Sequence, residues 1–327
     1  GKKAENCGLS ELPVGAGPWL RADDVPFADA IGSALGNNVV YSTLHVDESG
    51  NPLLASFESF TATDRDGTFL TKFDNNADCE RWTTTQPLQT FGSAPALGST
   101  LASSGDWTFD EHGAGCSTHQ RLTCLQKGPA PALSGHARPG HREAFLTSAN
   151  VTGNLGGIAG ADATCRSAAA AAHLHQPDSF KALITSAALG SNIIDRFEFD
   201  GPWYRRDGLI FAHSKAELIG GAVTLPLNVT ETGAYSGIAV ALTGARPDGT
   251  PSGHDCDNWS QDSLASPARG ALANTIAFYG NVRDWLGPAD VSCISAPAPG
   301  DWPRKLFCLS DSDVVFHGEF DNVPASP

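Results

Sequence analysis

The sequence predicts two tandem copies of one loop-rich domain of mixed helices and strands, held together by disulfides. Its 327 residues suffice for two domains of ordinary size, and its 35 Gly and 21 Pro indicate many turns rather than long helices. The eight cysteines, an even number, indicate a disulfide framework. They form two sets of four in which the second and third members lie 37 residues apart: Cys7, Cys79, Cys116 and Cys124, then Cys165, Cys256, Cys293 and Cys308.

Other residues around the cysteines recur in the same order, which is the signature of a duplicated domain. The matching segments are Gly17-Pro18-Trp19 with Gly201-Pro202-Trp203, Asp66-Gly67-Thr68 with Asp248-Gly249-Thr250, Trp82 with Trp259, Trp107 with Trp285, and Arg121–Cys124 with Arg304–Cys308. Because the tryptophans recur beside cysteines, we expect most of them to pack against disulfides in the core.

The repeat divides the chain into four parts. We expect the first copy over 1–126, a linker rich in Pro, Gly and Ala over 127–142, the second copy over 143–310 and a C-terminal tail over 311–327. Proline makes the linker semi-extended, so the two copies are expected to be loosely coupled. Four apolar residues of the tail predict a short strand: Val314, Val315, Phe316 and Phe320.

Local patterns place the main elements coarsely. The alanine run over 161–173 predicts the main helix of the second copy, and 180–186 predicts a strand. Short helices are expected over 214–219 and, in the first copy, over 27–35. The segments "RLTC" and "RKLFC" are expected to be core strands, whereas the interval from Cys256 to Cys293 is expected to consist of long loops.

The second copy resembles a known bacterial family. The stretch "AFLTSANVTGNLGGIAGADATCRSAAAAAHL", followed by "FKALITS", "DGLIFA", "PLNVTETG", "CDNWS" and "RKLFC", is similar to the DUF1554 domain. The resemblance covers roughly 143–310 and implies an α+β domain of the endostatin-like form of the C-type lectin fold. The cysteine spacing alone leaves three pairings per copy. The resemblance implies nested pairs, Cys165–Cys308 outside Cys256–Cys293, and the repeat carries them over to Cys7–Cys124 and Cys79–Cys116.

The first copy departs from this pattern near its start. Cys165 lies 36 residues before Gly201, but Cys7 lies only 10 residues before Gly17. A large part of the main helix and a strand are therefore missing from the first copy. Either this copy has degenerated, or the C-terminal tail or a strand of a neighbouring subunit fills the gap, since an uncovered sheet edge recruits strands.

Two sets of residues are candidates for binding. Calcium takes hard oxygen ligands, and four acidic residues of the first copy supply them: Asp64, Asp66, Asp74 and Asp78. A polar Asp-Gly turn is the alternative interpretation of this stretch. Trp259 and Trp302 are the candidates for exposed contacts with a ligand, because Trp302 has no counterpart in the first copy. No other cofactor is expected.

Composition and motifs favour binding or assembly over catalysis. No nucleophile elbow, metalloprotease motif, phosphate loop or paired-carboxylate signature is present, so we predict that the protein is not an enzyme. The net charge of −15, without a basic cluster, disfavours nucleic acid as a partner. No apolar run is long enough to span a bilayer. Asn150, Asn228 and Asn258 begin Asn-x-Ser/Thr sequons.

Two functions remain. Disulfides persist outside the cytosol, which indicates an extracellular or cell-surface protein. The first function is an adhesin or lectin-like protein that recognises a glycan or a surface protein. The alternative is a structural subunit of an extracellular filament or surface layer, in which a neighbouring subunit or the tail completes the first copy by self-assembly.

Overall fold

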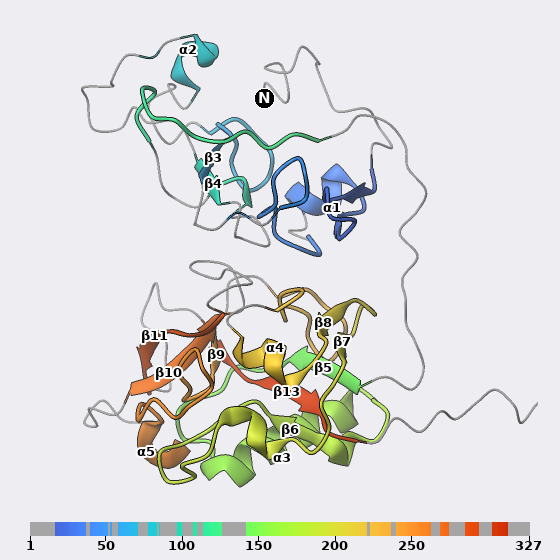
Figure 1. Ribbon diagram of the computed structural model, residues 1–327, viewed down its shortest axis with the longest axis vertical. Helices are drawn as coiled ribbons and strands as arrows, with labels where there is room; N and C mark the ends of the chain where they lie inside the picture. Colours follow the sequence, from blue (N-terminus) through green and yellow to red (C-terminus); the bar gives the residue numbers. More distant parts are fainter. Residues whose placement is uncertain are drawn as a thin grey trace, which may run out of the picture. The chain divides into compact units, whose positions relative to one another are not determined.

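The chain forms two compact units (Figure 1): the first is made of Gly1–Ser134 and Ile276–Val282, and the second of Gly135–Thr275 and Arg283–Pro327. The structure is a computed structural model, and it describes residues 17–36, 40–51, 53, 58–70, 78–83, 85, 97–99, 107–109, 114–125, 142–220, 223–236, 240–262, 269–274, 285–293 and 303–312. Within these ranges, no helix is long and apolar enough to cross a membrane. Each unit mixes short helices with small sheets.

A five-stranded sheet forms the centre of the second unit. Its strands, in spatial order, are β6 (Phe180–Ala182), β13 (Phe307–Ser310), β5 (Arg142–Leu146), β7 (Trp203–Arg205) and β8 (Ile210–Ala212). Strand β5 runs antiparallel to β13 and parallel to β7. Three consecutive residues of β5, Ala144 to Leu146, are fully buried, so both faces of the sheet are covered at this point.

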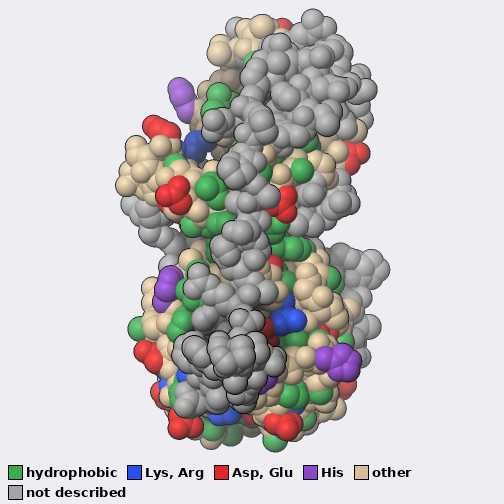
Figure 2. All heavy atoms as spheres, turned by 90° about the vertical axis from the view of Figure 1, so that its right-hand side faces the viewer, with side chains coloured by type: hydrophobic (Ala, Val, Ile, Leu, Met, Phe, Trp, Pro, Cys, Tyr) green, Lys and Arg blue, Asp and Glu red, His purple; other side chains and the backbone are tan. Residues whose placement is uncertain are grey.

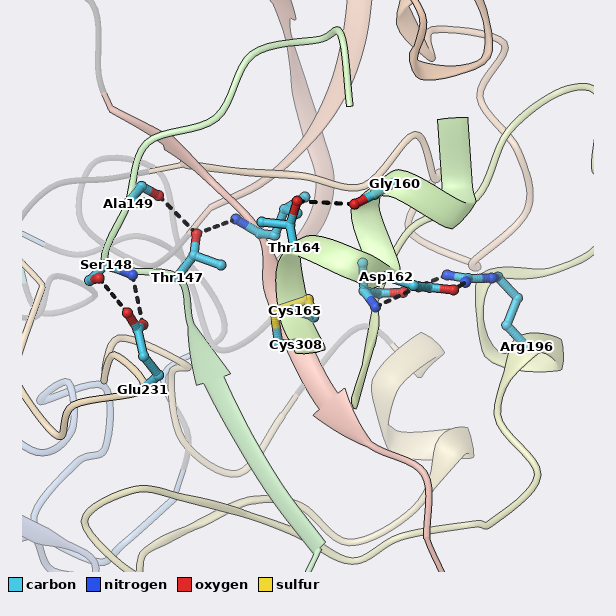
Figure 3. Close-up of a disulfide and its surroundings, with 12 residues drawn as sticks. Thr147, Ser148, Ala149, Gly160, Asp162, Thr164, Cys165, Arg196, Glu231 and Cys308 are labelled. Atoms are coloured by element: carbon cyan, nitrogen blue, oxygen red, sulfur yellow. Dashed lines mark hydrogen bonds and ion pairs between the residues drawn. A yellow bond between two sulfur atoms is a disulfide. The ribbon is translucent and has the colours of Figure 1, made fainter. Parts of the chain in front are cut away.

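The alanine-rich segment forms the main helix, α3 (Gly157–Ala171), which begins earlier than predicted. Ala161, Cys165 and Ala169, spaced four residues apart, face the core. Figure 3 shows how Cys165 joins this helix to β13 through a disulfide with Cys308. On the helix, the carboxylate of Asp162 accepts a hydrogen bond from the backbone N–H of Ala182, at 2.9 Å, and fixes β6 beside it.

A second sheet corrects one prediction. Its order is β11 (Leu286–Ser292), β10 (Arg269–Asn274), β9 (Val240–Leu242) and β12 (Arg304–Lys305). Strands β10 and β11 form an antiparallel pair inside the Cys256–Cys293 interval, so the expectation of loops throughout was wrong. The reason is compositional: "RGALAN" and "LGPADVS" lack the β-branched alternation by which strands are found.

Short helical segments complete the second unit. They are η3 (Pro177–Ser179), η4 (Ile193–Arg196), α4 (Lys215–Ile219) and α5 (Cys256–Trp259). The Ser214 hydroxyl caps α4 by accepting a hydrogen bond from the N–H of Glu217, at 3.2 Å, which is why the helix begins where it was predicted. The segment "RKLFC" is buried in β12 and β13, in line with the expectation of core strands.

The first unit is built from smaller pieces. Its elements are β1 (Trp19–Leu20), β2 (Pro26–Ala28), α1 (Ile31–Gly36), β3 (Glu58–Phe60), α2 (Cys79–Trp82) and β4 (Leu97–Ser99). The helix expected over 27–35 begins only at Ile31, because the residues before it pair with β1. The segment "RLTC" is not a core strand: Arg121 makes a single bridge to Ser59, and the residues after it are in no strand.

The same local structures recur in the two units. In each, a cis Gly-Pro peptide leads into a strand, a second antiparallel strand and a short helix: β1, β2 and α1 correspond to β7, β8 and α4. Strands β3 and β4 correspond to β9 and β10, and the bridge from Ser59 to Arg121 corresponds to the pairing of Ala241 with Lys305. Within the described residues, the first unit has no counterpart of β5, α3 or β6.

Three disulfides join cysteines that the structure describes. Cys165–Cys308 lies outside Cys256–Cys293 in the second unit, which is the nesting that the resemblance implied. Cys79–Cys116 in the first unit matches the inner pair. Cys124 is exposed and has no disulfide partner among the described residues, and Cys7 lies outside them, so the Cys7–Cys124 bond stays a prediction.

Candidate functional site

The second unit presents an exposed apolar loop tip, formed by Ala187, Ala188, Leu189 and Gly190. All four residues are exposed, and the side chain of Leu189 retains 44% of its accessible surface. Large apolar side chains with this exposure are few among the described residues: Leu20, Leu122 and Leu189. An apolar side chain at the end of a loop contributes nothing to the core, so the tip is a candidate contact surface.

Hydrogen bonds hold every backbone N–H group of the loop tip. The carboxylate of Asp255 accepts from Ala187 at 2.7 Å, and the side-chain oxygen of Asn258 accepts from Ala188 at 3.1 Å. Ser186 accepts the other two, from Leu189 through its hydroxyl at 3.2 Å and from Gly190 through its carbonyl at 3.1 Å. With its amides satisfied, the tip is pre-organised, which lowers the entropic cost of binding.

The residues that hold the tip belong to a left-handed turn. In α5, the four φ angles from Cys256 to Trp259 are 50°, 54°, 55° and 64°. This conformation costs about 1–2 kcal/mol per residue outside glycine, so surrounding contacts must enforce it. The Cys256–Cys293 disulfide fixes one end, and the buried indole of Trp259 fixes the other by donating to the carbonyl of Thr185 at 2.9 Å. Enforced backbone strain of this kind concentrates at functional sites.

The structure corrects the role expected for Trp259. Its side chain is 0% exposed and lies in the core with Cys256, Cys293 and Leu306, so the expectation of an exposed ligand contact was wrong. The buried indole stabilises the turn from the core side and is not exposed to a ligand. Trp302, the other expected contact, lies outside the described residues.

The first unit repeats the left-handed turn but covers it less. Cys79, Glu80 and Trp82 have φ angles of 50°, 55° and 62°, and the Cys79–Cys116 disulfide anchors the turn as in the second unit. Trp82 is only half-buried and contacts the ring of Phe60, with centroids 5.4 Å apart. The turn is therefore a property of the repeat, whereas its burial differs between the two units.

The acidic residues proposed for calcium form a turn. Asp66 accepts hydrogen bonds from the N–H and hydroxyl of Thr68, at 2.8 and 2.6 Å, and the N–H of Gly67 donates to the carbonyl of Asp64 at 2.9 Å. Asp74 lies outside the described residues, and Asp78 precedes the left-handed turn. The structure groups no three His, Cys, Asp or Glu side chains around a metal position within its described ranges. The geometry favours the Asp-Gly turn.

An open face on the first unit is the second candidate surface. We define it by Glu58, Phe60, Trp82, Leu122 and Cys124, all of which are half-buried or exposed. Their counterparts in the second unit are fully buried: Val240, Leu242, Trp259, Leu306 and Cys308. The contrast is largest for Leu122, which is 72% exposed where Leu306 is 0% exposed. The open face thus consists of residues whose counterparts lie in the core of the second unit.

A buried Arg-Asp pair organises the second unit. The guanidinium of Arg205 pairs with Asp207 and donates to the carbonyl of Pro226 at 2.8 Å and to the side chain of Asn228 at 3.1 Å. Burial acts to lower the pKa of Arg205, but the charge of Asp207 outweighs it, so the net shift is upward. Because Asn228 is buried in this network, its sequon is inaccessible in the folded protein, while Asn150 and Asn258 are exposed.

A second buried charge, that of Lys305, lies where β5 ends. The ammonium of Lys305 donates to the carbonyls of Thr147 and Ser148, at 2.9 and 2.6 Å. Burial lowers the pKa of Lys305, although the nearby charge of Glu231 acts in the opposite direction. Glu231 in turn accepts hydrogen bonds from the N–H and hydroxyl of Ser148 (Figure 3). Each group satisfies a loop backbone, so the arrangement fixes the loop rather than activating a nucleophile.

Sequence reasoning missed the loop tip. The tip sequence, Ala-Ala-Leu-Gly, carries no motif, and its position depends on Asp255 and Asn258, which lie about seventy residues later in the chain. Charge does not mark a binding surface either. In Figure 2, acidic and basic side chains of the second unit are scattered over the visible face. No protein-family model and no curated protein matches the chain, so the resemblance to DUF1554 stays an expectation.

Proposed function

We propose that the protein is an extracellular binding protein built from two lectin-like copies, and that the loop tip of the second unit contacts its ligand. The observation that carries this proposal is the tip itself: an exposed apolar loop whose four backbone amides are all held by Ser186, Asp255 and Asn258. Three disulfides support an extracellular location, because such bonds persist outside the cytosol.

The chemistry of the tip favours a protein ligand over a free sugar. Leu189 and the two alanines offer apolar contact area, and the tip has no aromatic ring on which a sugar would pack. Apolar side chains that are fixed before binding are typical of the centre of protein interfaces. A surface protein or an extracellular matrix protein is therefore the partner class that the tip fits best.

Binding assays on a panel of extracellular matrix proteins, with a glycan array beside them, test this function. Leu189→Asp should weaken binding at least tenfold, because it places a charge in a desolvated contact. Ser117→Asp, at an exposed residue of the first unit, is the control and should bind like wild type. Equal binding by wild type and Leu189→Asp would exclude the tip as the contact surface.

A second function, a structural subunit of a filament or surface layer, is favoured by a different observation. The open face places Leu122, Trp82 and Phe60 on the surface of the first unit at positions that are buried in the second. Such a patch is typical of an interface. Multi-angle light scattering of native protein tests this function: a stable monomer at every concentration would exclude it.

A further inference from the structure

The second unit shows what closes its sheet at the position of the open face. Strand β5 lies between β7 and β13, with Ala144 opposite Arg205 on one side and Phe145 opposite Cys308 on the other. Just after the strand, the N–H of Thr147 donates to the carbonyl of Leu306 at 2.9 Å. A single strand with an apolar centre thus joins the two halves of the sheet and helps bury Leu306.

The first unit keeps both neighbours of this strand. Strand β1 corresponds to β7, and Leu122–Leu125 corresponds to the segment from Leu306 to Leu309. The structure describes no strand between β1 and Leu122–Leu125, and apolar side chains on both sides are exposed, Leu20 on one and Leu122 on the other. Leu125 still packs into the core cluster of Trp19, Phe27 and Trp107, so this segment is held in place. The first unit therefore offers a site for one strand.

The C-terminal segment of the chain has the composition of that strand. The order Asp313-Val314-Val315-Phe316 repeats that of Glu143-Ala144-Phe145-Leu146: one acid followed by three apolar residues. The chain leaves the second unit at a fixed point, because the Asp311 carboxylate pairs with Lys181 and accepts from the N–H groups of Glu198 and Phe199. The fifteen residues after Ser312 span about 50 Å when extended, many times the length of a three-residue contact.

We propose that the C-terminal segment of a second copy of this chain adds to the first unit as the strand that β5 forms in the second unit. This inference rests on the structural-subunit function and names its contact. Leu122 and Cys124 are exposed, so the site is accessible to the segment of another copy, and cross-linking distinguishes this occupant from the segment of the same chain. The strand would run parallel to β1 and antiparallel to Leu122–Leu125, with Val315 opposite Cys124. One end of each chain then engages the other end of the next, which gives an open, head-to-tail filament.

Mixing two assembly-deficient variants tests the contact. Leu122→Asp damages the acceptor site, and deletion of 313–327 removes the donor. Each variant should stay a monomer in light scattering, 34.1 kDa for Leu122→Asp and correspondingly less for the deletion, while wild type assembles with concentration. An equimolar mixture should give one complex with the summed mass of the two chains, because one intact donor meets one intact acceptor. Leu189→Asp is the control and should assemble like wild type. Assembly by either variant alone, or a mixture that stays monomeric, would overturn the proposal.

A cysteine scan fixes the register without relying on the deletion. In a Cys7→Ser background, single cysteines placed from Val314 to Phe316 are oxidised with copper phenanthroline. Directly opposed strand residues have Cα atoms about 4.5–5.5 Å apart, which suits a disulfide. Val315→Cys should therefore cross-link to Cys124 between chains at least fivefold more than its neighbours. Cross-links within one chain, or equal yields at every position, would contradict the proposal.

These outcomes are separable from those of the proposed functions. If wild type assembles but neither cross-linking nor complementation occurs, the structural function holds and the strand contact is wrong. If wild type is monomeric, and Cys124 of the Cys7→Ser variant reacts with maleimide as fast as a model thiol, both the subunit function and the strand contact fail. Binding of matrix proteins through Leu189 is measured independently of either result.

Discussion

The two units place the same residues in different surroundings. Leu306 and Cys308 are fully buried between β5 and α3, whereas Leu122 and Cys124, at the corresponding positions of the first unit, are exposed. The neighbouring Trp-bearing strand, its partner strand and the short helix after them are nearly the same in both units. The difference is confined to the face that β5 and α3 cover in the second unit.

This difference shows that burial depends on the element that covers a residue as well as on the residue itself. The left-handed turn recurs in both units, and in each a disulfide anchors it. The core beneath it survives only where α3 is present. A copy that lacks some elements can thus keep its disulfide and its left-handed turn, while residues that would otherwise lie in the core become exposed.

Removal of the outer disulfide should lower the free energy of unfolding more than any other predicted change, and only that of the second unit. Cys165→Ala with Cys308→Ala opens a loop of 143 residues. The chain-entropy model gives about 5 kcal/mol for a loop of this length, and the burial of both cysteines adds a packing loss. Scanning calorimetry should show one transition shifted down and the other unchanged. Cys79→Ala with Cys116→Ala is the control and should shift the other transition, by about 4 kcal/mol for its 37-residue loop.

Truncation of the corresponding leucines should separate the buried face from the open face directly. Leu306→Ala removes methyl groups from a closed core and should cost about 3 kcal/mol. Leu122→Ala removes the same groups from the surface and should change the free energy of unfolding by less than about 0.5 kcal/mol. Urea unfolding of the monomeric protein measures both. A cost above about 2 kcal/mol for Leu122→Ala would mean that the open face is covered in the isolated chain.

Much of the fold could be predicted because its signals are local. The alanine run gave α3, Ser214 gave the start of α4, and the cysteine and tryptophan spacing gave a repeat whose local structures recur in both units. These features depend on residues within a few turns of one another in the sequence. Capping and helix propensity act over that range, so a single sequence is enough to find them.

Apart from strands β10 and β11, whose composition hides them, the failures involve contacts between distant segments. Whether Trp259 is exposed depends on Thr185 and Leu306, and whether "RLTC" is a core strand depends on elements that the first unit lacks among its described residues. The loop tip is invisible in the sequence for the same reason, since Asp255 supplies its support from afar. Pattern and propensity carry no information on which surface another segment will cover.

The Arg-Asp pairs of the two units allow a third comparison, based on how the stability of each unit depends on pH. Burial acts to raise the pKa of Asp207, but the charge and hydrogen bonds of Arg205, with the hydroxyl of Tyr235, outweigh it and hold that pKa below its usual value. Such a carboxyl stabilises the fold above its unfolded pKa of about 3.9, and this contribution is lost as the pH falls through the folded value. Asp207→Asn should therefore cost about 2 kcal/mol at pH 7 and should flatten the loss of stability of the second unit below pH 4.

The corresponding variant of the first unit, Asp23→Asn, should also lower the free energy of unfolding, but by a smaller amount. Asp23 also has a lowered pKa, because hydrogen bonds and charge from Arg21 outweigh burial, but its carboxylate is more exposed than that of Asp207. Water screens an exposed pair, so Asp23→Asn should cost less than Asp207→Asn. Acid titration followed by tryptophan fluorescence measures both variants. Equal effects would mean that the two pairs are equally buried in solution.

The smallest effect is expected from calcium, and it decides between two interpretations of the acidic turn in the first unit. Asp66 already accepts two hydrogen bonds from Thr68, and the corresponding Asp248 accepts the same two from Thr250. If these carboxylates serve only the turns, about 1 mM calcium should leave both calorimetric transitions unchanged. Asp66→Ala should then lower the first unit's transition slightly and equally with or without calcium. A calcium-dependent rise in that transition, abolished by Asp66→Ala, would instead establish a metal site that only the first copy has.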